Sequence, residues 1–473
     1  MTRHVCGDPM HWRTAPLKTA RLRCSRPKTS LLPTEAISTK ILLAASLLAR
    51  LVVLAILGVL AIAGPAHAFV ADTKPVVYRV ASVSELTELL ARTESEPAGA
   101  VTIELAPGHY HLTPSPYLDP TCGNCEDPGQ PVPATVGLCL SAPRLTLRAS
   151  HPDSVVIHTH AGYGVLIEDC EDCRLEGLTV TGTVRDTAAM ATSAAIVVRR
   201  SQLAIENCTI GPNLGDSSVV AGTVSGVMGI CGREGARLHV RNSRILRNSW
   251  DGIALYRDAS ARIESCLIDG IDGGRLGPVC GGRGVAVGVT WNARAEIRDN
   301  LIRRYWKGIG LFVDAEAEVE GNIVESVLTW GIALWDAGRG LPFARITGNA
   351  VFDTGACGIS VTREREGGRA GSSIARNAIL RTGLDPRYDS PDRYCRQEAL
   401  ALQAVTPGME IGPNWLAANR EADGRPGQSD QSWADFREAT EAMRTRMARV
   451  PVLVGSRFLE VCQRKSAPQS AAR

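Results

Sequence analysis

A short aliphatic segment recurs seven times through the middle of the 473-residue chain. Each copy begins and ends on an aliphatic residue and has a small or amide-bearing residue at its fourth position. The fourth residues, 22 to 35 residues apart, are Cys208, Ser243, Cys266, Asn300, Asn322, Asn349 and Asn377. A unit of about 22 residues cannot bury its aliphatic side chains alone, so consecutive units must stack into a solenoid with one continuous core. Asn at such a turn tolerates a left-handed backbone and can hydrogen-bond to its equivalents in the next units.

A second segment runs in phase with the first and begins with glycine in each unit. Its aliphatic side chains alternate with small or exposed ones, which is the period of a strand with one buried face. The copies are Gly252–Tyr256, Gly284–Gly288, Gly308–Phe312, Gly331–Trp335 and Gly358–Thr362. Two short strands per unit predict an all-β fold, a right-handed parallel β-helix. Leucine-rich repeats, the competing solenoid, would require a denser leucine pattern.

The ends of the solenoid carry helical signals. Ser82 and Glu85 form a capping-box pattern, which predicts an amphipathic helix through about Arg92 that covers the open end of the first coil. The periodicity stops near Gly383, and we expect helices near 396–404 and 431–448. The predicted organisation is a parallel β-helix with its N-terminal cap at 69–383, followed by a C-terminal loop and helical cap at 384–473.

Residues 1–68 have the composition of an export leader. A short apolar run from Leu51 to Ala63 is followed by Gly-Pro and then by Ala66-His67-Ala68, a pattern typical of signal-peptide cleavage. The alternative is a signal anchor that stays uncut. Without this segment the chain has 43 basic and 47 acidic residues, which gives no support for nucleic-acid binding. We expect a secreted or periplasmic monomer with no stable membrane span after cleavage.

Twelve of the fourteen cysteines follow Ala68. In an oxidising compartment disulfides are their default use, although the sequence does not give the pairing. Cys122-x-x-Cys125 and Cys170-x-x-Cys173 also have the spacing of zinc ligands. No histidine follows either pair at zinc-finger spacing, so the disulfide interpretation is preferred.

The opening Ile103-Glu-Leu-Ala-Pro-Gly-His-Tyr110, the helix before it and the two repeated segments resemble the pectate-lyase-like superfamily of right-handed β-helix repeat proteins. The resemblance spans roughly residues 76–383. It implies the fold but no single activity, because the superfamily includes lyases, hydrolases, epimerases, esterases and binding proteins. The sequence motifs of its polygalacturonases, mannuronan epimerases, pectate lyases and pectin methylesterases are missing from this chain.

The outward positions of the second segment predict a surface strip that could bind sugar rings. One row is small, at Ala254, Ala286, Gly310, Ala333 and Ser360, and the next row is largely aromatic. The candidate substrate-binding residues are Trp250, Tyr256, Arg283, Trp291, Trp306, Phe312, Trp330 and Trp335. A flat strip edged by aromatic rings suits stacking against pyranose faces. The alternatives are that loops pack over the strip, or that it forms a protein interface.

Charged residues concentrate at the same place. Asp251 and Asp336 are candidate general acid and base groups or Ca²⁺ ligands, and Arg304 and Lys307 are candidates to neutralise a sugar carboxylate or act as base. Asp251, Arg283, Lys307 and Trp330 each precede the glycine of the second segment, so we expect them at one corner. A ladder of ion pairs between coils explains the charged members equally well. The sequence predicts no protein metal site, and Ca²⁺ is its one candidate cofactor.

Two functional hypotheses remain open. In the first, the protein binds a polysaccharide along the strip between Asp251 and Asp336 and cleaves it as a lyase or hydrolase. In the second, it is a non-catalytic β-helix that serves as a surface structure or adhesin. The sequence leaves undecided whether the protein is an enzyme.

Overall fold

The computed structural model divides the chain into two units, residues 1–73 and 74–473. It describes residues 75–95, 99–188, 190–216, 225–271, 284–363, 369–385, 396–403, 405, 408–420 and 429–466. The predicted leader, residues 1–68, lies outside these ranges. Within them no helix is long and apolar enough to span a membrane.

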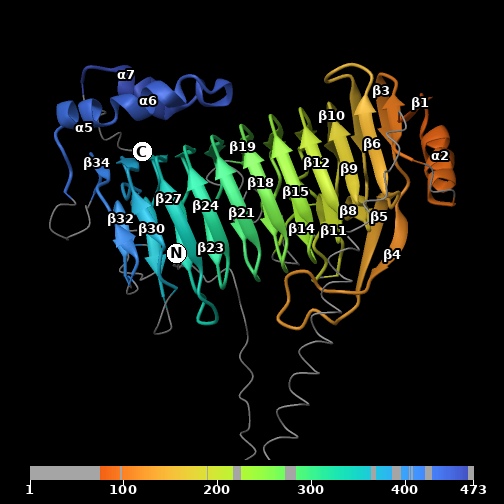
Figure 1. Cartoon of the computed structure of the whole chain (residues 1–473), viewed down its shortest axis with the longest axis horizontal. Coiled ribbons are helices and arrows are strands. Elements are labelled where there is room, and N and C mark those ends of the chain that lie inside the picture. The colour runs from red at the N-terminus through yellow and green to blue at the C-terminus, as the bar shows by residue number, and fades with distance from the viewer. Residues whose placement is uncertain are drawn as a thin grey trace, which may run out of the picture. The chain divides into compact units, whose positions relative to one another are not determined.

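Three long sheets run side by side along the molecule, and each coil of the chain adds one strand to each sheet (Figure 1). Apart from the antiparallel pair β4–β5, adjacent strands are parallel. Sheet A consists of β1 (Val76–Val80), β2 (Val101–Leu105), β6 (Arg144–Ala149), β9 (Asp172–Glu176), β12 (Gln202–Glu206), β15 (Arg237–Arg241), β18 (Ser260–Glu264), β21 (Arg294–Arg298), β24 (Glu316–Glu320), β27 (Phe343–Thr347), β30 (Ser373–Ala375) and β33 (Glu410–Ile411).

The other two sheets have eleven strands each. Sheet B consists of β3 (Gly108–His111), β7 (Val155–His158), β10 (Leu178–Thr181), β13 (Thr209–Ile210), β16 (Arg244–Leu246), β19 (Leu267–Asp269), β22 (Leu301–Arg303), β25 (Ile323–Glu325), β28 (Ala350–Phe352), β31 (Ala378–Leu380) and β34 (Trp415–Ala417). Sheet C consists of β4 (Ser115–Asp119), β5 (Val132–Leu140), β8 (Tyr163–Glu168), β11 (Ala194–Arg199), β14 (Met228–Arg233), β17 (Ile253–Leu255), β20 (Val285–Val289), β23 (Lys307–Phe312), β26 (Ile332–Trp335), β29 (Ile359–Thr362) and β32 (Leu400–Leu402). The predicted parallel β-helix is confirmed.

The first repeated segment spans the turn from sheet A to sheet B, and its fourth position forms a ladder. Asn300, Asn322, Asn349 and Asn377 are fully buried, and each side-chain amide bonds to the next one along the stack. The ladder continues to Asn414 in a coil that the sequence did not predict. The left-handed backbone falls on the residue before each Asn, such as Asp299 with φ 55°, and not on the Asn itself. Asn is therefore required here for its hydrogen bonds.

The N-terminal helix is confirmed. Helix α2 (Val83–Ser95) begins after Ser82, whose hydroxyl accepts the Glu85 backbone N–H at 3.2 Å, while the Glu85 carboxylate accepts the Ala81 N–H at 2.8 Å. Its apolar face, which includes Leu86 and Leu89, joins the interior cluster of the β-helix. Figure 1 shows the helix beside β1 at the end of the stack.

The C-terminal region differs from the prediction in two ways. The helix expected near 396–404 is wrong, because β32 and the following β33 and β34 form one more coil beyond Gly383. The expected helix at 431–448 corresponds to α5 (Trp433–Ala439) and α6 (Glu441–Met447), and α7 (Arg457–Gln463) follows a 3₁₀ turn, η2 (Pro451–Leu453). These helices pack on the outer face of sheet B, against residues of β22, β25, β28, β31 and β34. The three C-terminal helices therefore cover the outer face of sheet B over several coils of the β-helix.

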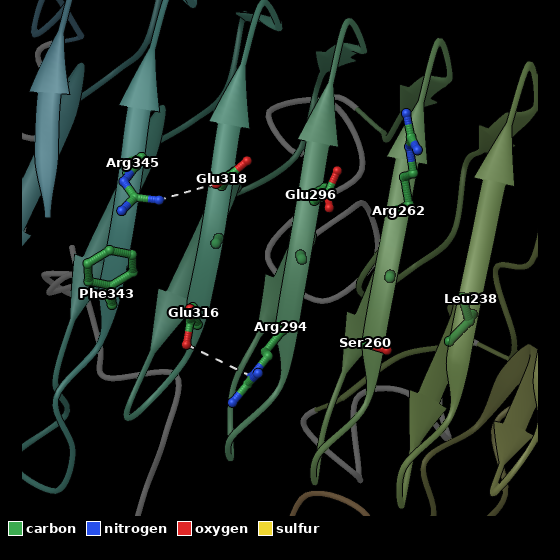
Figure 2. A pocket seen from close by; sticks show the side chains of 12 residues that line it. Leu238, Ser260, Arg262, Arg294, Glu296, Glu316, Glu318, Phe343 and Arg345 are labelled. Carbon is green, nitrogen blue, oxygen red and sulfur yellow. Dashed lines mark hydrogen bonds and ion pairs between the residues drawn. The ribbon is translucent and has the colours of Figure 1, made fainter. Parts of the chain in front are cut away.

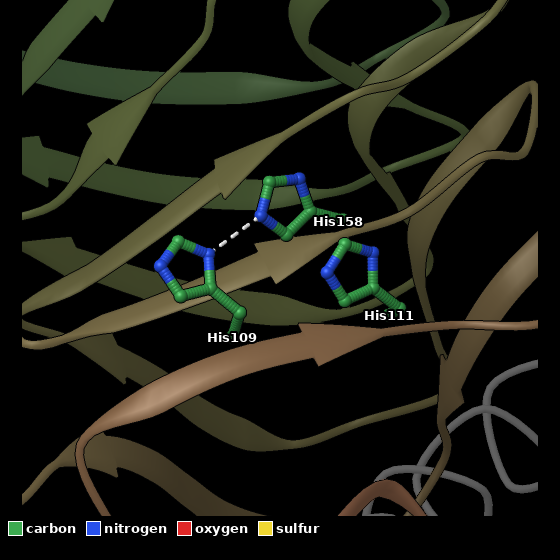
Figure 3. A group of neighbouring side chains, drawn as sticks. All are labelled: His109, His111 and His158. Atoms are coloured by element: carbon green, nitrogen blue, oxygen red, sulfur yellow. Dashed lines mark hydrogen bonds between the residues drawn. The ribbon is translucent and has the colours of Figure 1, made fainter.

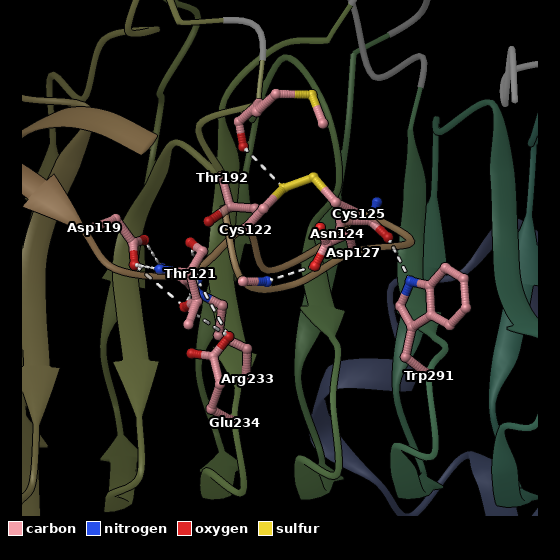
Figure 4. The surroundings of a disulfide bond; sticks show 12 residues. Asp119, Thr121, Cys122, Asn124, Cys125, Asp127, Thr192, Arg233, Glu234 and Trp291 are labelled. Carbon is pink, nitrogen blue, oxygen red and sulfur yellow. Dashed lines mark hydrogen bonds and ion pairs between the residues drawn. A yellow bond between two sulfur atoms is a disulfide. The ribbon is translucent and has the colours of Figure 1, made fainter. Parts of the chain in front are cut away.

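The hairpin of β4 and β5 contributes a loop that lies against sheet C (Figure 4). Cys122 and Cys125 form a disulfide within this loop, and Cys170 and Cys173 form a second one. The zinc alternative for these two pairs is therefore wrong. Cys208, Cys231, Cys266 and Cys462 are buried thiols, so disulfides are not the general use of cysteine in the described part of the chain.

Candidate functional site

The outward rows of sheet C are covered. Ala254 pairs with Gly288, and the row continues through Gly310, Ala333 and Ser360, all of them buried. Gly288 therefore takes the place predicted for Ala286, because Gly252 aligns with Ala286 and not with Gly284. The sequence analysis aligned this coil on Gly284 because each copy of the second segment was taken to begin with glycine. Ala286 is small enough to occupy that position, so the predicted alignment of this coil is wrong by two residues. The expected flat, open strip does not occur.

The corner before the glycine column holds a buried polar cluster. Register places Asp251, Val285, Lys307 and Trp330 in successive coils, with Val285 where Arg283 was expected. Arg283 itself lies outside the described residues. Asp251 and Lys307 are only 6% and 5% exposed. The fold thus brings together three of the four residues that the sequence predicted at this corner.

Asp251 is held by its surroundings on both oxygens. Its Oδ1 accepts the Val285 backbone N–H at 2.6 Å, and its Oδ2 accepts the Tyr256 hydroxyl at 3.4 Å. Gly284 has no side chain, and a Cβ at this position would lie 2.1 Å from Asp251 Oδ1. Glycine is therefore required here by the close approach of the carboxylate.

The electrostatics of this cluster favour a carboxyl that exchanges protons near neutral pH. Burial raises the pKa of Asp251 to about 6, opposed by the Val285 N–H, the Lys307 charge and the Tyr256 hydroxyl. Burial also raises the pKa of Tyr256 well above its usual value, and the neighbouring Asp251 charge adds to this. Tyr256 is thus a neutral proton donor beside Asp251. Lys307 Nζ lies 4.8 Å from the centre of the Trp330 ring.

The aromatic candidates fall into two groups. Tyr256, Phe312, Trp330 and Trp335 are buried, and Trp335 meets both Phe312 and Trp330 edge to face. Their burial matches the loop-packing alternative. Trp250, Trp291 and Trp306 are half-buried, and these rings keep exposed surface that a ligand could contact.

Two of the half-buried residues are sequence neighbours of the polar cluster, and the third contacts the disulfide loop. Trp250 and Trp306 directly precede Asp251 and Lys307. Trp291 donates its indole N–H to Asn124 Oδ1 at 2.9 Å (Figure 4). The Arg257 guanidinium lies over the Trp291 ring.

Asp336 and Arg304 lie away from the cluster. Asp336 follows β26, so register places it about 20 Å from Asp251 along the strand direction and three coils further on. It is fully buried, with Arg363 at 3.9 Å, and Asp251 and Asp336 therefore cannot act as an acid–base pair. Arg304 makes a two-pronged ion pair with Asp269, both contacts at 2.6 Å. Arg304 fits the ion-pair ladder alternative.

A groove of about 390 Å³ crosses the outer face of sheet A (Figure 2). Its carboxylates are paired: Glu318 lies 2.8 Å from Arg298 and 3.3 Å from Arg345, and Glu316 lies 2.8 Å from Arg369. The hydrogen bond from Arg369 lowers the pKa of Glu316. These groups form a ladder of ion pairs between neighbouring strands of sheet A.

A histidine cluster on sheet B was missed by the sequence reasoning. His109 and His111 of β3 face His158 of β7 (Figure 3), with His160 two residues further on. The sequence signal for this cluster is two His-x-His patterns, at His109–His111 and His158–His160. Alternate residues of a strand share one face, so each pattern places two histidines on the same face.

Comparison with known proteins supports the fold. Residues 228–379 match a family model described as the right-handed β-helix region, and no curated protein matches the chain. Among solved structures, an alginate lyase from a Paenibacillus species is 12% identical, with 72% of this chain and 98% of that one covered and a TM-score of 0.38. The surface adhesin PfbA of Streptococcus pneumoniae is 11% identical, with 74% and 96% covered and a TM-score of 0.40.

A pectate lyase from Xanthomonas campestris is also similar, at 10% identity, with 63% of this chain and 82% of that one covered and a TM-score of 0.34. Similarity at this level assigns neither a substrate nor a reaction to this chain.

Proposed function

We propose that this right-handed parallel β-helix protein binds a uronate-containing polysaccharide at the corner of sheet C formed by Asp251, Tyr256 and Lys307, and cleaves it by β-elimination. The observation that carries the proposal is a buried carboxyl that accepts the Tyr256 hydroxyl and interacts electrostatically with the Lys307 ammonium two coils away. The half-buried Trp250 and Trp306 directly precede Asp251 and Lys307 in the chain. Export from the cytoplasm is part of the proposal, and the two disulfides support it.

The residues have distinct roles in this reaction. The ammonium of Lys307 neutralises the uronate carboxylate, which acidifies the proton on the adjacent ring carbon. The Asp251 carboxylate removes that proton, and the electron pair forms a carbon–carbon double bond as the neighbouring glycosidic C–O bond breaks. The Tyr256 hydroxyl protonates the departing oxygen. The products are a saturated end and an unsaturated uronate end.

The first test is an ultraviolet assay for the unsaturated product, with the full-length protein and a panel of pectins, alginates and glycosaminoglycans. Each polymer is tested with Ca²⁺ and with a chelator, because Ca²⁺ binds uronate carboxylates. We expect Asp251→Asn to lower kcat by about 100-fold, since Asn keeps the Val285 hydrogen bond but cannot accept a proton. Asp258→Asn is the matched control, because Asp258 is exposed in the turn after β17.

Equal activity in the parent and Asp251→Asn would contradict the assigned base. Silence of the parent on every polymer would overturn elimination on these substrates. In that case the burial of Tyr256, Phe312, Trp330 and Trp335 would favour the non-catalytic alternative, a structural or adhesive β-helix.

The activity should also depend on pH in a defined way. The base form of Asp251 is the ionised one, so kcat/KM should rise as the pH increases through about 6, the pKa of this carboxyl. The same shift has the opposite effect on stability. Because the folded pKa lies above the unfolded value of about 3.9, the folded state loses about 3 kcal/mol as the pH rises from about 4 to 6. A profile that falls between pH 5 and pH 7 would exclude Asp251 as the base.

A further inference from the structure

Four of the nine histidines of the chain gather on the outer face of the first coils of sheet B. The register pairs His111 directly with His158, and each has a second histidine two residues away on the same face, His109 and His160. Nearly fifty residues separate the two strands in sequence, so the fold and not local chain geometry brings them together.

The rings form a close stack with their nitrogens in contact. His111 and His158 have ring centres 4.3 Å apart with an angle of 3° between the planes. Nδ1 of His109 lies 2.9 Å from Nε2 of His158, and Nδ1 of His111 lies 3.3 Å from Nε2 of His160. Each of these pairs shares one proton, because two facing N–H groups would repel each other. In each of these two contacts, the nitrogen that does not carry the shared proton has a lone pair.

The surroundings of His158 favour the neutral form of its ring. Burial lowers the pKa of His158, and the three other histidines lower it further. The next strand of sheet B places Thr181, a neutral residue, beside His158. The neutral ring is the form that binds a metal ion.

We propose that His109, His111 and His158 bind one divalent transition-metal ion of the imidazole-preferring class, such as Zn²⁺, with His160 as the fourth ligand. The ligand nitrogens of the first three residues all lie within 4.8 Å of one another. A tetrahedral ion with bonds of about 2.05 Å needs nitrogens about 3.4 Å apart, so the rings must turn to bring these nitrogens closer and to direct their lone pairs at one ion. His109, His111 and His160 are exposed, so the ion enters directly from solvent.

Such an ion would join β3 to β7. Its ligands come from residues 109–111 and 158–160, and binding therefore ties the coil next to helix α2 to the following one. This role is independent of the reaction proposed at sheet C, and either can fail without the other.

The test is Zn²⁺ binding by titration calorimetry on the full chain, with the double variant His111→Gln/His158→Gln and with His239→Gln as control. His239 lies on sheet A, where it contacts Glu264 at 3.2 Å. We expect the parent and His239→Gln to bind one ion that the double variant binds at least 100-fold more weakly. Any ion bound elsewhere in the chain is common to all three proteins and cancels in the comparison.

Two further readouts distinguish coordination from nonspecific binding. Zn²⁺ should raise the melting midpoint of the parent by several degrees but not that of the double variant, while Mg²⁺ should raise neither. The Cu²⁺-loaded parent should show nitrogen hyperfine structure in its electron paramagnetic resonance spectrum. Equal Zn²⁺ affinity in the parent and in a double variant that melts normally without metal would overturn the proposal.

Discussion

Replacing Asp119 with asparagine should lower the free energy of unfolding by about 3–5 kcal/mol. Asp119 ends β4, and its fully buried carboxylate lies between two buried guanidinium groups, those of Arg199 at 3.2 Å and of Arg233. It also accepts the Tyr163 hydroxyl at 2.7 Å. Asparagine has the same shape but no charge. Among the described residues, the variant would therefore remove the only fully buried carboxylate of this network and leave Arg199 and Arg233 paired only with Glu168 and Glu234, which are partly exposed.

The pH dependence of this interaction has a defined sign. Burial tends to raise the pKa of Asp119, but Arg233, Tyr163 and Arg199 together outweigh it and hold the pKa below its usual value. The contribution to stability is therefore present above the unfolded pKa of about 3.9 and is lost as the pH falls through the lower, folded pKa.

The measurement is urea unfolding, with Asp169→Asn as the matched control. Asp169 is exposed and pairs with Arg200 at 2.7 Å, so its replacement should cost less than about 1 kcal/mol. The Asp119→Asn variant should shift the urea midpoint without changing the slope. Shifts of equal size in the two variants would show that the buried Asp119 carboxylate stabilises the fold no more than an exposed ion pair does.

The second large effect is expected at the centre of the asparagine ladder. We expect Asn349→Ala to lower the free energy of unfolding by about 3–5 kcal/mol, because several buried hydrogen bonds lose a partner. Asn349 accepts the Asn322 backbone N–H at 3.0 Å and donates to Val319 O at 2.9 Å and to Asn377 Oδ1 at 3.0 Å. Alanine supplies none of these groups.

The chain itself offers the graded control for this position. In an earlier coil Ser243 takes the same place, where its hydroxyl accepts the Cys208 N–H at 3.1 Å and donates to Arg241 O at 2.8 Å. Asn349→Ser should therefore keep part of the ladder and lose about half as much stability as Asn349→Ala. The interpretation fails if urea unfolding gives the same midpoint for the parent and both variants.

The sequence predicted the features that depend on local periodicity. The sequence predicted two strands per unit because side chains alternate along a strand and the aliphatic ones must be buried. The structure has three, since the first repeated segment contains the turn between a strand of sheet A and a strand of sheet B. The ladder position at Asn300 through Asn377 follows from the same spacing, and the start of α2 follows from Ser82 and Glu85. Each of these signals lies within about ten residues of sequence.

The three-dimensional structure decided how the coils align and what covers them. Gly284 and Ala286 fit the glycine column equally well in sequence, and only the pairing with Gly252 selects Ala286. The same pairing puts Val285 between Asp251 and Lys307 and places Asp336 at the opposite end of the strands from Asp251, three coils further on. Because the coils differ in length, the sequence alone does not show which residues of one coil pair with which residues of the next.

The contacts that matter most for the predictions above join residues far apart in sequence. Asp119 meets Arg233 across 114 residues, and His111 meets His158 across 47. Such contacts depend on which coil each residue occupies and which way its strand faces. Local patterns fix the direction of a side chain within its own coil, but only the stacking of coils determines which side chain lies opposite.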